Sequence, residues 1–543
     1  MFRALASIII VTSIVGWPIG RPSPARAGDP DVVGSRHKTP DFNGDGYADL
    51  AIGVINEDVG RQSNAGAVNV IYGSPRGLRA NAGQLWTQDS PGIADRAEAR
   101  DHFGWAVAGA DFDGDGYTDL AVGAPFEDVA RRSKAGSVNV IYGSPRGLTA
   151  AGNQSWTQAT RGIAEEPGSN DQFGWGVAAG DFDGDGFADL AVGVKFEDIG
   201  SQRDAGGFHV VYGSSRGLTA AGDQFWTQAT SGIPDSPEAN DQFGRTLAAG
   251  DFDGDRFDDL AVGAPYESYL GHRDGRLHVI RGSRNGLTPS GNQSWSQASP
   301  GMTDQPDLRD QFGIALAAAD FDRDGLDDLA ISVTFEDFRF IGNEGAVHVI
   351  YGTRRGLSAA RERWWNQGST GISGQPEQGD EFGQSLAAAD YDGDRYDDLA
   401  IGVPREDHSS DVHSDPGGFH VIYGSSRGLT SSGDQFFSQD TPGIADSAQR
   451  NDHFGEGLAG GDFDGDGRDD LAVSAPWEDI SGRADAGAVH VIYGTASGLR
   501  AAGGQFWTQE TRGISGRANT DDQFGWALSA ERPASGTPRL LAP

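Results

Sequence analysis

An acidic motif returns seven times along this 543-residue chain, at an almost constant interval. Its second copy, residues 111–119, reads Asp-Phe-Asp-Gly-Asp-Gly-Tyr-Thr-Asp and is followed directly by an apolar segment. A fixed period near 70 residues indicates one repeated supersecondary unit, so the fold depends on how seven copies pack together. The copies begin at Asp41, Asp111, Asp181, Asp251, Asp320, Asp390 and Asp462.

Each repeat contains four segments that are typical of short β-strands, with no helical periodicity. In the second repeat they cover residues 105–110, 120–124 and 137–142 and the residues around Trp156, and glycine-rich turns separate them. Four antiparallel strands in each of seven repeats predict an all-β fold, a seven-bladed β-propeller. A parallel β-helix with calcium-binding turns is excluded, because its period is about nine residues.

The two ends of the chain supply complementary parts of one repeat. No Phe-Gly segment precedes the first acidic motif at Asp41, whereas Phe524-Gly525 has no acidic motif after it. We expect the N- and C-terminal strands to share one blade, which closes the ring and hides both sheet edges. The predicted propeller covers residues 41–530, between a linker at 28–40 and a C-terminal tail at 531–543.

Residues 1–27 have the pattern of a signal peptide. Arg3 precedes an apolar run at 4–17, and Ala25-Arg26-Ala27 matches the small-x-small pattern of a cleavage site. No later segment has the roughly 20 apolar residues of a membrane-spanning helix, and the sequence contains no cysteine for disulfides. We therefore expect a secreted, extracellular protein with no transmembrane segment after signal cleavage.

The net charge of −37 limits the possible partners. It excludes nucleic acid, because an acidic chain repels phosphate and no basic cluster is present to release counterions. Cations are favoured, with Ca²⁺ first among them.

The acidic motif has the ligand spacing of a calcium loop. Alternate carboxylates at positions 1, 3 and 5, a glycine at position 6, a carbonyl at position 7 and a carboxylate at position 9 can surround one Ca²⁺. An EF-hand is excluded, because position 12 is apolar and the flanking segments are strands. A metal-free, solvated acidic turn is the alternative. The predicted ligands of up to seven Ca²⁺ are Asp41, Asn43, Asp45, Tyr47, Asp49, Asp111, Asp113, Asp115, Tyr117, Asp119, Asp181, Asp183, Asp185, Phe187, Asp189, Asp251, Asp253, Asp255, Phe257, Asp259, Asp320, Asp322, Asp324, Leu326, Asp328, Asp390, Asp392, Asp394, Tyr396, Asp398, Asp462, Asp464, Asp466, Arg468 and Asp470.

The seven loops differ in ways that predict graded affinities. Arg256 in the fourth loop and Arg395 in the sixth replace the glycine at position 6, which strains a left-handed backbone and adds positive charge. Asn43 replaces a carboxylate in the first loop, and Arg323 stands at position 4 of the fifth. We expect loops four and six to bind most weakly.

Three elements of each repeat together resemble the FG-GAP repeats of integrin alpha-subunit head domains. In the second repeat they are Phe103-Gly104, the acidic loop at 111–119 and Gly123-Ala124-Pro125. The resemblance covers roughly residues 41–530 and implies a seven-bladed propeller with Ca²⁺ on one face and ligands on the opposite face. The chain departs from the pattern at Gly193-Val194-Lys195 and Ser332-Val333-Thr334, and integrin signalling is not implied.

Two further repeated features could serve either the scaffold or a ligand. A Glu-Asp pair, as at Glu127-Asp128, could line a ring for a cationic partner, but the favoured interpretation is that it caps a turn through backbone amides. An aromatic residue in a Trp-x-Gln pattern could stack on sugars, but burial between blades is favoured. These aromatic residues are Trp86, Trp156, Trp226, Trp295, Trp365, Phe437 and Trp507.

No catalytic motif is present in the sequence, and no repeat stands out as an active site. We therefore predict a calcium-binding module without enzymatic activity that serves in binding or cell adhesion. It would meet a protein or glycan ligand on the face opposite the acidic loops, where long loops on a rigid scaffold are available. A calcium-dependent lectin and a secreted hydrolase with a loop-built site remain as alternatives.

Overall fold

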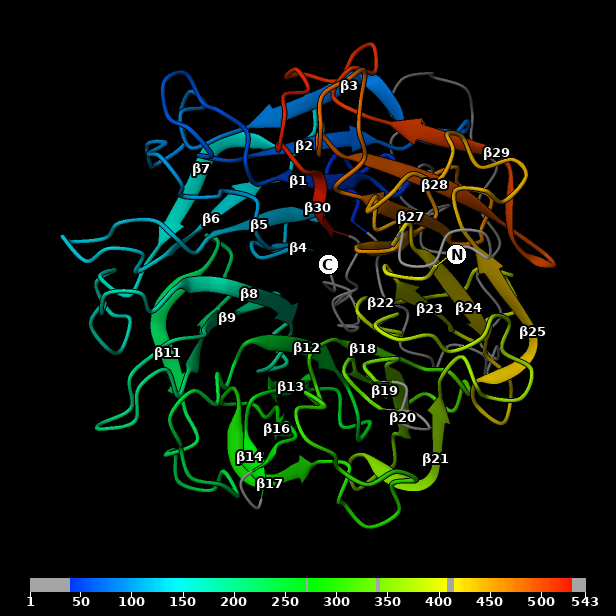
Figure 1. The fold of residues 1–543 in the computed structure, drawn as a ribbon. Helices are drawn as coiled ribbons and strands as arrows, with labels where there is room; N and C mark the ends of the chain where they lie inside the picture. The colour runs from blue at the N-terminus through cyan, green and yellow to red at the C-terminus, as the bar shows by residue number, and fades with distance from the viewer. Residues whose placement is uncertain (1–39, 270–271, 338–341, 408–414, 530–543) are drawn as a thin grey trace, which may run out of the picture.

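Seven four-stranded antiparallel sheets surround a central axis (Figure 1), which confirms the predicted seven-bladed β-propeller. The computed structural model describes residues 40–269, 272–337, 342–407 and 415–529. The predicted signal peptide, nearly all of the predicted linker and the predicted tail lie outside these ranges. Within them no helix forms, and accordingly none that could cross a bilayer.

The innermost strand of each blade faces the central axis, and the second strand pairs with it. In the order of blades one to seven, the innermost strands are β30 (Phe524–Ser529), β4 (Val107–Ala110), β8 (Phe173–Gly180), β12 (Thr246–Gly250), β18 (Leu316–Ala319), β22 (Leu386–Ala389) and β26 (Leu458–Gly461). The second strands are β1 (Leu50–Val54), β5 (Asp119–Ala124), β9 (Asp189–Val194), β13 (Asp259–Ala264), β19 (Asp328–Val333), β23 (Asp398–Val403) and β27 (Asp470–Ala475).

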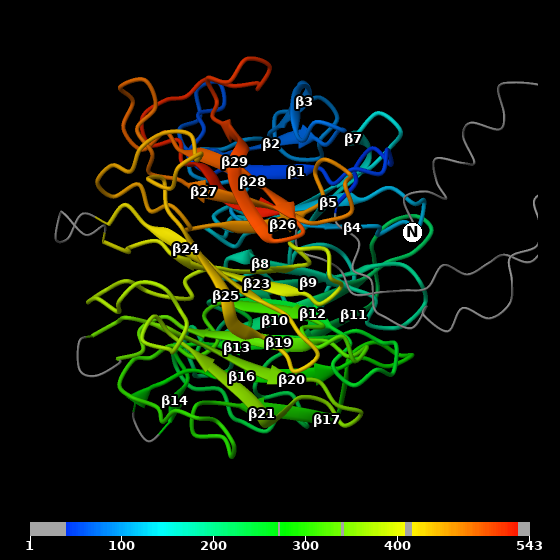
Figure 2. The same ribbon diagram turned by 90° about the vertical axis from the view of Figure 1, so that its right-hand side faces the viewer.

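The third and fourth strands complete each blade towards the rim, and Figure 2 shows the blades from the side with loops projecting at both ends of the strands. The third strands are β2 (Ala67–Tyr72), β6 (Ser137–Tyr142), β10 (Gly207–Tyr212), β16 (Arg276–Arg281), β20 (Ala346–Tyr351), β24 (Gly418–Tyr423) and β28 (Ala488–Thr495). The outer strands are β3 (Arg79–Trp86), β7 (Thr149–Trp156), β11 (Thr219–Trp226), β17 (Thr288–Trp295), β21 (Ser358–Trp365), β25 (Thr430–Phe437) and β29 (Gly498–Trp507). A small hairpin, β14 (Ser268–Tyr269) and β15 (His272–Arg273), is added in blade four.

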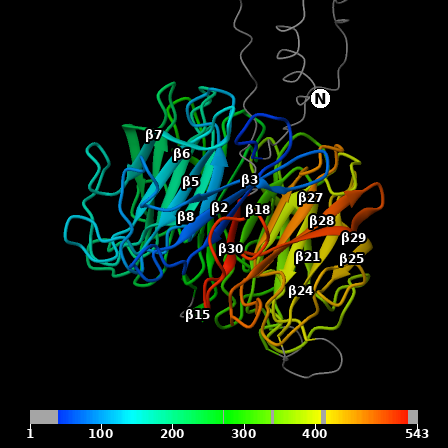
Figure 3. The same ribbon diagram turned by 90° about the horizontal axis from the view of Figure 1, so that it is seen from above.

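The ring closes as the chain ends predicted. Strand β30 pairs antiparallel with β1, with Ala51 opposite Ser529 and Val54 opposite Phe524. The first blade therefore joins segments from the two ends of the chain, and Figure 3 shows β30 beside the N-terminal blade. Because the ring is closed, every blade packs against a neighbouring blade on both of its faces.

The burial of each strand follows from its position in the blade. All six residues of β5 and of β6 are buried, because neighbouring blades cover both faces of the sheet. This double coverage explains why the second strands read as apolar runs rather than as alternating patterns. The outer strand β7 is exposed in the middle and buried only at Trp156.

The innermost strands are rich in small residues, as in Val-Ala-Gly-Ala of β4 and Leu-Ala-Ala-Ala of β18. Small side chains allow seven strands to converge on one axis. The central channel between them has a volume of about 110 Å³ and is lined by alanine, glycine and leucine. This is well below the roughly 300 Å³ of an ordinary ligand pocket.

The hydrophobic core lies between blades rather than within them. One buried cluster joins Trp156 and Val140 of blade two to Phe173 and Leu190 of blade three. The predicted burial of the repeated aromatic residues is confirmed at six positions, and Trp295 is partly buried.

Polar contacts also cross each interface between blades. The Tyr142 hydroxyl donates to Gln154 Oε1 at 2.6 Å and accepts the amide of Leu218 in the next blade at 3.3 Å. Gln154 Nε2 donates in turn to the Leu218 carbonyl at 2.9 Å.

The two members of the Glu-Asp pair have different roles. Asp128 Oδ1 accepts the backbone amide of Lys134 at 2.8 Å, which confirms the predicted turn cap. Glu127 instead accepts a 2.7 Å hydrogen bond from Gln88 Nε2 of the preceding blade. Equivalent bonds ring the molecule, at Gln158–Glu197, Gln228–Glu267, Gln297–Glu336, Gln367–Glu406, Gln439–Glu478 and Gln509–Glu57.

Replacing Glu127 with glutamine should flatten the pH dependence of stability in chelator. Burial, and then the charges of Asp101 and Asp95, raise the pKa of Glu127 to about 9 from 4.5. The folded protein keeps a proton that the unfolded chain releases, so this stabilisation is complete below the unfolded pKa and is lost as the pH rises towards 9. Urea titrations at about pH 5 and at about pH 8.5 measure the free energy of unfolding. Between these two pH values the variant should lose at least about 1 kcal/mol less of this free energy than the wild type does. The same loss in both proteins would contradict the raised pKa, and Glu166→Gln on an exposed loop is the control.

Removing β30 should open the ring. A chain that ends at Gln523 exposes the free edge of β1, so we expect a lower melting temperature and oligomers on light scattering. A chain that ends at Ser529 keeps β30 and should behave as the full chain does. A monomer with an unchanged melting temperature after truncation at Gln523 would show that closure is not needed.

Candidate metal centres

The acidic loops all lie on one face of the ring, where the second strands begin. The loop at residues 111–119 connects β4 to β5, and the next five loops occupy the same place in their blades. The loop at 41–49 precedes β1, and its blade takes the innermost strand from the other end of the chain. Six loops therefore join two consecutive strands of a blade, whereas the first does not, because the innermost strand of its blade is β30.

Backbone amides hold the loop carboxylates in place. Asp111 Oδ1 accepts the amide of Asp115 at 3.1 Å, and Asp111 Oδ2 accepts that of Gly116 at 3.0 Å. Asp119, at position 9, is fully buried and accepts the amides of Phe112 and Gly143, each at 2.8 Å. Position 9 thus ties the acidic loop to the turn between the third and fourth strands of its own blade.

The structure brings predicted ligands together in several loops. In each of three groups, carboxylate oxygens lie within 4.8 Å of one another. The groups are Asp41, Asp45 and Asp49 in loop one, Asp111, Asp113 and Asp115 in loop two, and Asp181, Asp183 and Asp189 in loop three. The assignment of all predicted residues to Ca²⁺ stays a prediction.

Burial and neighbouring charges make the carboxylates at position 9 hard to ionise without a cation. Burial, followed by the charges of Asp113 and Asp111, raises the pKa of Asp119 to about 8 against two favourable amide contacts. Burial and neighbouring loop charges likewise raise the pKa of Asp470 to about 9. The donors are oxygens only, which suits a hard divalent cation such as Ca²⁺.

The backbone dihedral angles of the loops confirm the predicted strain where arginine occupies position 6. Gly46 and Gly116 have φ of 90° and 94° there, in the left-handed region. Arg256 and Arg395 adopt φ of 77° and 78° at the same position. Both arginines therefore pay the steric cost that glycine avoids.

Contacts between adjacent loops are a feature that the sequence reasoning missed. A Cβ on Gly44 of loop one would lie 2.6 Å from the ring of Tyr117 in loop two. In six loops position 4 is covered by position 7 of the next loop, which explains the glycine there, and loop five has Arg323 instead. The residue at position 8 can also contact the preceding loop. In loop four this residue is Asp258, whose Oδ2 accepts a hydrogen bond from the Asp181 amide of loop three at 2.7 Å.

Arginine side chains enter two of the loops, which the sequence reasoning also missed. Arg281 Nη1 contacts Asp253 in loop four, and Arg361 Nη2 contacts Asp322 in loop five. Arg281 ends β16 where the other third strands carry tyrosine, so its pairing could have been suspected from the repeat alignment. Both arginines supply positive charge at a predicted position 3 ligand.

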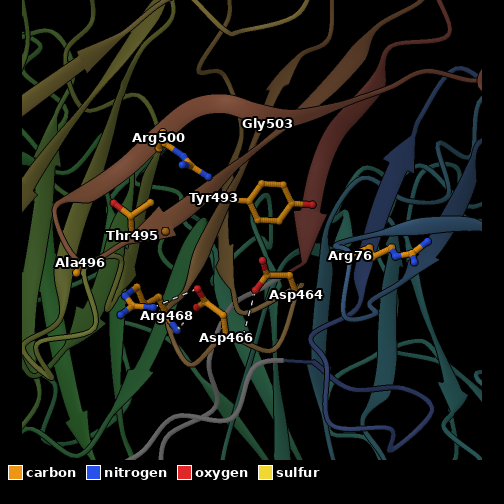
Figure 4. Close-up of a pocket in the computed structure, with 10 residues that line it drawn as sticks. Arg76, Asp464, Asp466, Arg468, Tyr493, Thr495, Ala496, Arg500 and Gly503 are labelled. Atoms are coloured by element: carbon orange, nitrogen blue, oxygen red, sulfur yellow. Dashed lines mark hydrogen bonds and ion pairs between the residues drawn. The ribbon is translucent and has the colours of Figure 1, made fainter.

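A pocket of about 440 Å³ lies beside loop seven, at the seam with blade one (Figure 4). Asp464, Asp466 and Arg468 line it from the loop, and Arg76 reaches it from blade one. Arg468 Nη1 lies 3.1 Å from Asp466 Oδ2. The pocket therefore offers both signs of charge next to a candidate metal loop.

The mouth of the channel on the opposite face breaks the repeat symmetry. The residue after each Phe-Gly is tryptophan in three consecutive blades and differs in the other four. The sequence reasoning did not note this difference between repeats. Repeat-by-repeat comparison of the sequence could have revealed the difference but not the side-chain cluster it builds.

The comparisons with known proteins agree with the geometry. The FG-GAP repeat model matches residues 39–71, 103–141, 173–211, 243–280, 312–350, 382–422 and 454–492.

The matches with relatives cover only part of each relative's length. Phosphatidylinositol-glycan-specific phospholipase D of Bos taurus is 33 % identical over 174 residues, which are 32 % of this chain and 20 % of that protein. Integrin alpha-PS2 of Drosophila melanogaster is 30 % identical over 246 residues, 44 % of this chain and 16 % of that protein. The chain spans at most a fifth of the length of these two relatives.

Among solved structures, the exotype rhamnogalacturonan lyase YesX aligns with 88 % of this chain and 72 % of its own, at 14 % identity and a TM-score of 0.37. A TM-score this low supports no conclusion about activity. Seven matched repeats, each carrying the acidic loop of one blade, show that the chain belongs to the FG-GAP repeat family and is related to integrin alpha subunits.

Proposed function

We propose that this protein is a secreted calcium-binding propeller that works as a binding or cell-adhesion module without covalent chemistry. The observation that carries the proposal is the gathering of loop carboxylates to within 4.8 Å of one another on one face of the ring. Sequence similarity to integrin alpha subunits supports a binding role. Similarity to a phospholipase D covers a fifth of that enzyme, and its activity is not transferred to this chain.

The loop residues fit Ca²⁺ in both donor type and charge. Amide contacts fix the carboxylates at positions 1 and 9 but use only part of each oxygen's acceptor capacity. Asp111, Asp113, Asp115, Asp119 and the carbonyl of Tyr117 would hold the ion in loop two. When bound, Ca²⁺ supplies the positive charge that permits the clustered carboxylates to ionise.

Metal in these loops would stabilise the scaffold that presents the opposite face. Because Asp119 bonds the amides of two different turns, its ionisation strengthens contacts that fix the blade. One site with free Ca²⁺ a hundredfold above its dissociation constant adds about 2.7 kcal/mol to folding. The ligand face gains rigidity without direct contact with the metal.

Chelation should lower the melting temperature, and added Ca²⁺ should restore it. Removing the cation leaves crowded carboxylates that either repel one another or must take up protons. Differential scanning calorimetry in EDTA, then in excess CaCl₂, measures the shift, and elemental analysis of the dialysed protein reports bound calcium. A melting curve insensitive to both additions would overturn the calcium proposal.

Alanine at Asp113 should reduce the calcium-dependent melting shift more than alanine at Asp253. Both residues occupy position 3, but Asp253 is already engaged by Arg281, and its loop contains Arg256 in a strained conformation. Calorimetry with and without CaCl₂ on both variants tests the ranking. Equal reductions would mean that loop four binds as well as loop two.

A further inference from the structure

The channel mouth opposite the acidic loops has one aromatic side and one polar side. Trp105 lies at this mouth. Its backbone amide donates to the Gly123 carbonyl at 3.2 Å, and Gly123 is near the end of β5 that is farther from the acidic loop. The residue after Phe-Gly is Trp526, Trp105 and Trp175 in blades one to three. In blades four to seven it is Arg245, Ile314, Gln384 and Glu456.

The three tryptophans form one continuous aromatic surface. The ring centroid of Trp105 lies 4.5 Å from that of Trp175 and 5.0 Å from that of Trp526, with the planes tilted by 49° and 47°. Phe126 extends the surface, 5.3 Å from Trp105. All four side chains are partly exposed, unlike the buried aromatic residues between blades.

Lys195 places a buried amine beside this surface. It stands where four of the repeats have the proline of Gly-Ala-Pro or its variants, and it is only 5 % exposed. Its Nζ lies 3.1 Å from the ring centroid of Trp175 and 4.2 Å from that of Phe196. Among the described residues, none forms an ion pair with it.

A second basic side chain, Arg245, completes the basic end of the mouth. Its guanidinium carbon lies 5.4 Å from the Trp175 ring centroid, and its Nη1 donates to Gln242 Oε1 at 2.9 Å. Burial and the nearby Arg245 lower the pKa of Lys195 to about 6, against the opposing effect of Asp204. Without a ligand the Lys195 amine is therefore mostly neutral at pH 7, and a bound carboxylate would favour its protonated form. Two adjacent cations are costly to bury unless an anion joins them.

The channel below the mouth limits what a ligand can be. Its volume of about 110 Å³ leaves no room for a group that enters deeply, and its alanine, glycine and leucine lining offers no polar side chain. A ligand must therefore lie across the mouth. A ring with an apolar face, hydroxyl groups and one negative charge matches tryptophan, Gln384 and the two basic side chains.

We propose that the mouth binds an acidic sugar residue, with its carboxylate at Lys195 and Arg245 and its ring against Trp105. The proposal rests on the binding role proposed for the face opposite the acidic loops. It explains why the Gly-Ala-Pro element is broken by a lysine in the third repeat alone. It also explains why two basic side chains lie together at this mouth in a chain with a net charge of −37.

Glucuronate and glucose form the matched pair of ligands for the test, because they differ only at the carboxylate. Tryptophan fluorescence and isothermal titration calorimetry on the full chain in CaCl₂ should show glucuronate binding at least about tenfold more tightly than glucose. Equal affinities, or no binding of either sugar at millimolar concentration, would overturn the proposal. Acetate that binds as tightly as glucuronate would also overturn it, since a carboxylate without a ring would suffice.

Variants locate the site. Lys195→Met and Trp105→Ala should each weaken glucuronate at least about tenfold, whereas Arg146→Met on the acidic-loop face should not. Lys195→Pro, which restores the residue of the second repeat, provides a second test of the lysine if the methionine variant misfolds. Undiminished affinity in a folded Lys195 variant would overturn the site.

The calcium-dependent melting shift of the same samples separates this proposal from the proposed metal role. A normal shift without glucuronate binding refutes only the sugar site. Glucuronate binding that depends on Lys195, in a protein without any calcium shift, supports the sugar site while refuting the metal role.

Discussion

No blade of this propeller can bury its hydrophobic surface alone, and the rest of the structure follows from that constraint. The second and third strands are buried on both faces, and the apolar clusters join residues of adjacent blades. Each blade is therefore stable only between two neighbours. Pairing of β30 with β1 gives the terminal blades the neighbours that a linear array would lack.

This arrangement places different kinds of loop on the two faces of the ring. Alternating strand direction puts every acidic loop at one end of the strands and every Glu-Asp loop at the other. Negative charge accumulates on the first face, where Asp119 and its equivalents are tied to the backbone. On the other face, Glu127 and its equivalents hold adjacent blades together through glutamine. Repetition of both contacts indicates that they serve the scaffold.

Residues that differ between repeats distinguish one blade from another, which the repeated residues cannot do. Arg281 and Arg361 distinguish loops four and five from the others by placing a cation on a candidate ligand. Lys195 and Arg245 distinguish one side of the channel mouth. Each of these residues replaces a more common residue at its repeat position, so the scaffold does not require it. Such a replacement can create a binding site for a ligand or change the metal affinity of a loop.

The sequence by itself determined the blade count, the four-strand unit, the shared first blade and the carboxylate spacing, because each is a periodic or local property of the chain. It also indicated that Asp128 would cap a turn, since its partner lies six residues away. Only the tertiary structure decided the contacts between residues far apart in sequence. Gln88 meets Glu127 across 39 residues, Arg281 reaches Asp253 across 28, and Trp105 meets Trp526 across the closure of the ring. Their positions depend on the twist and approach of neighbouring blades, which no local pattern encodes.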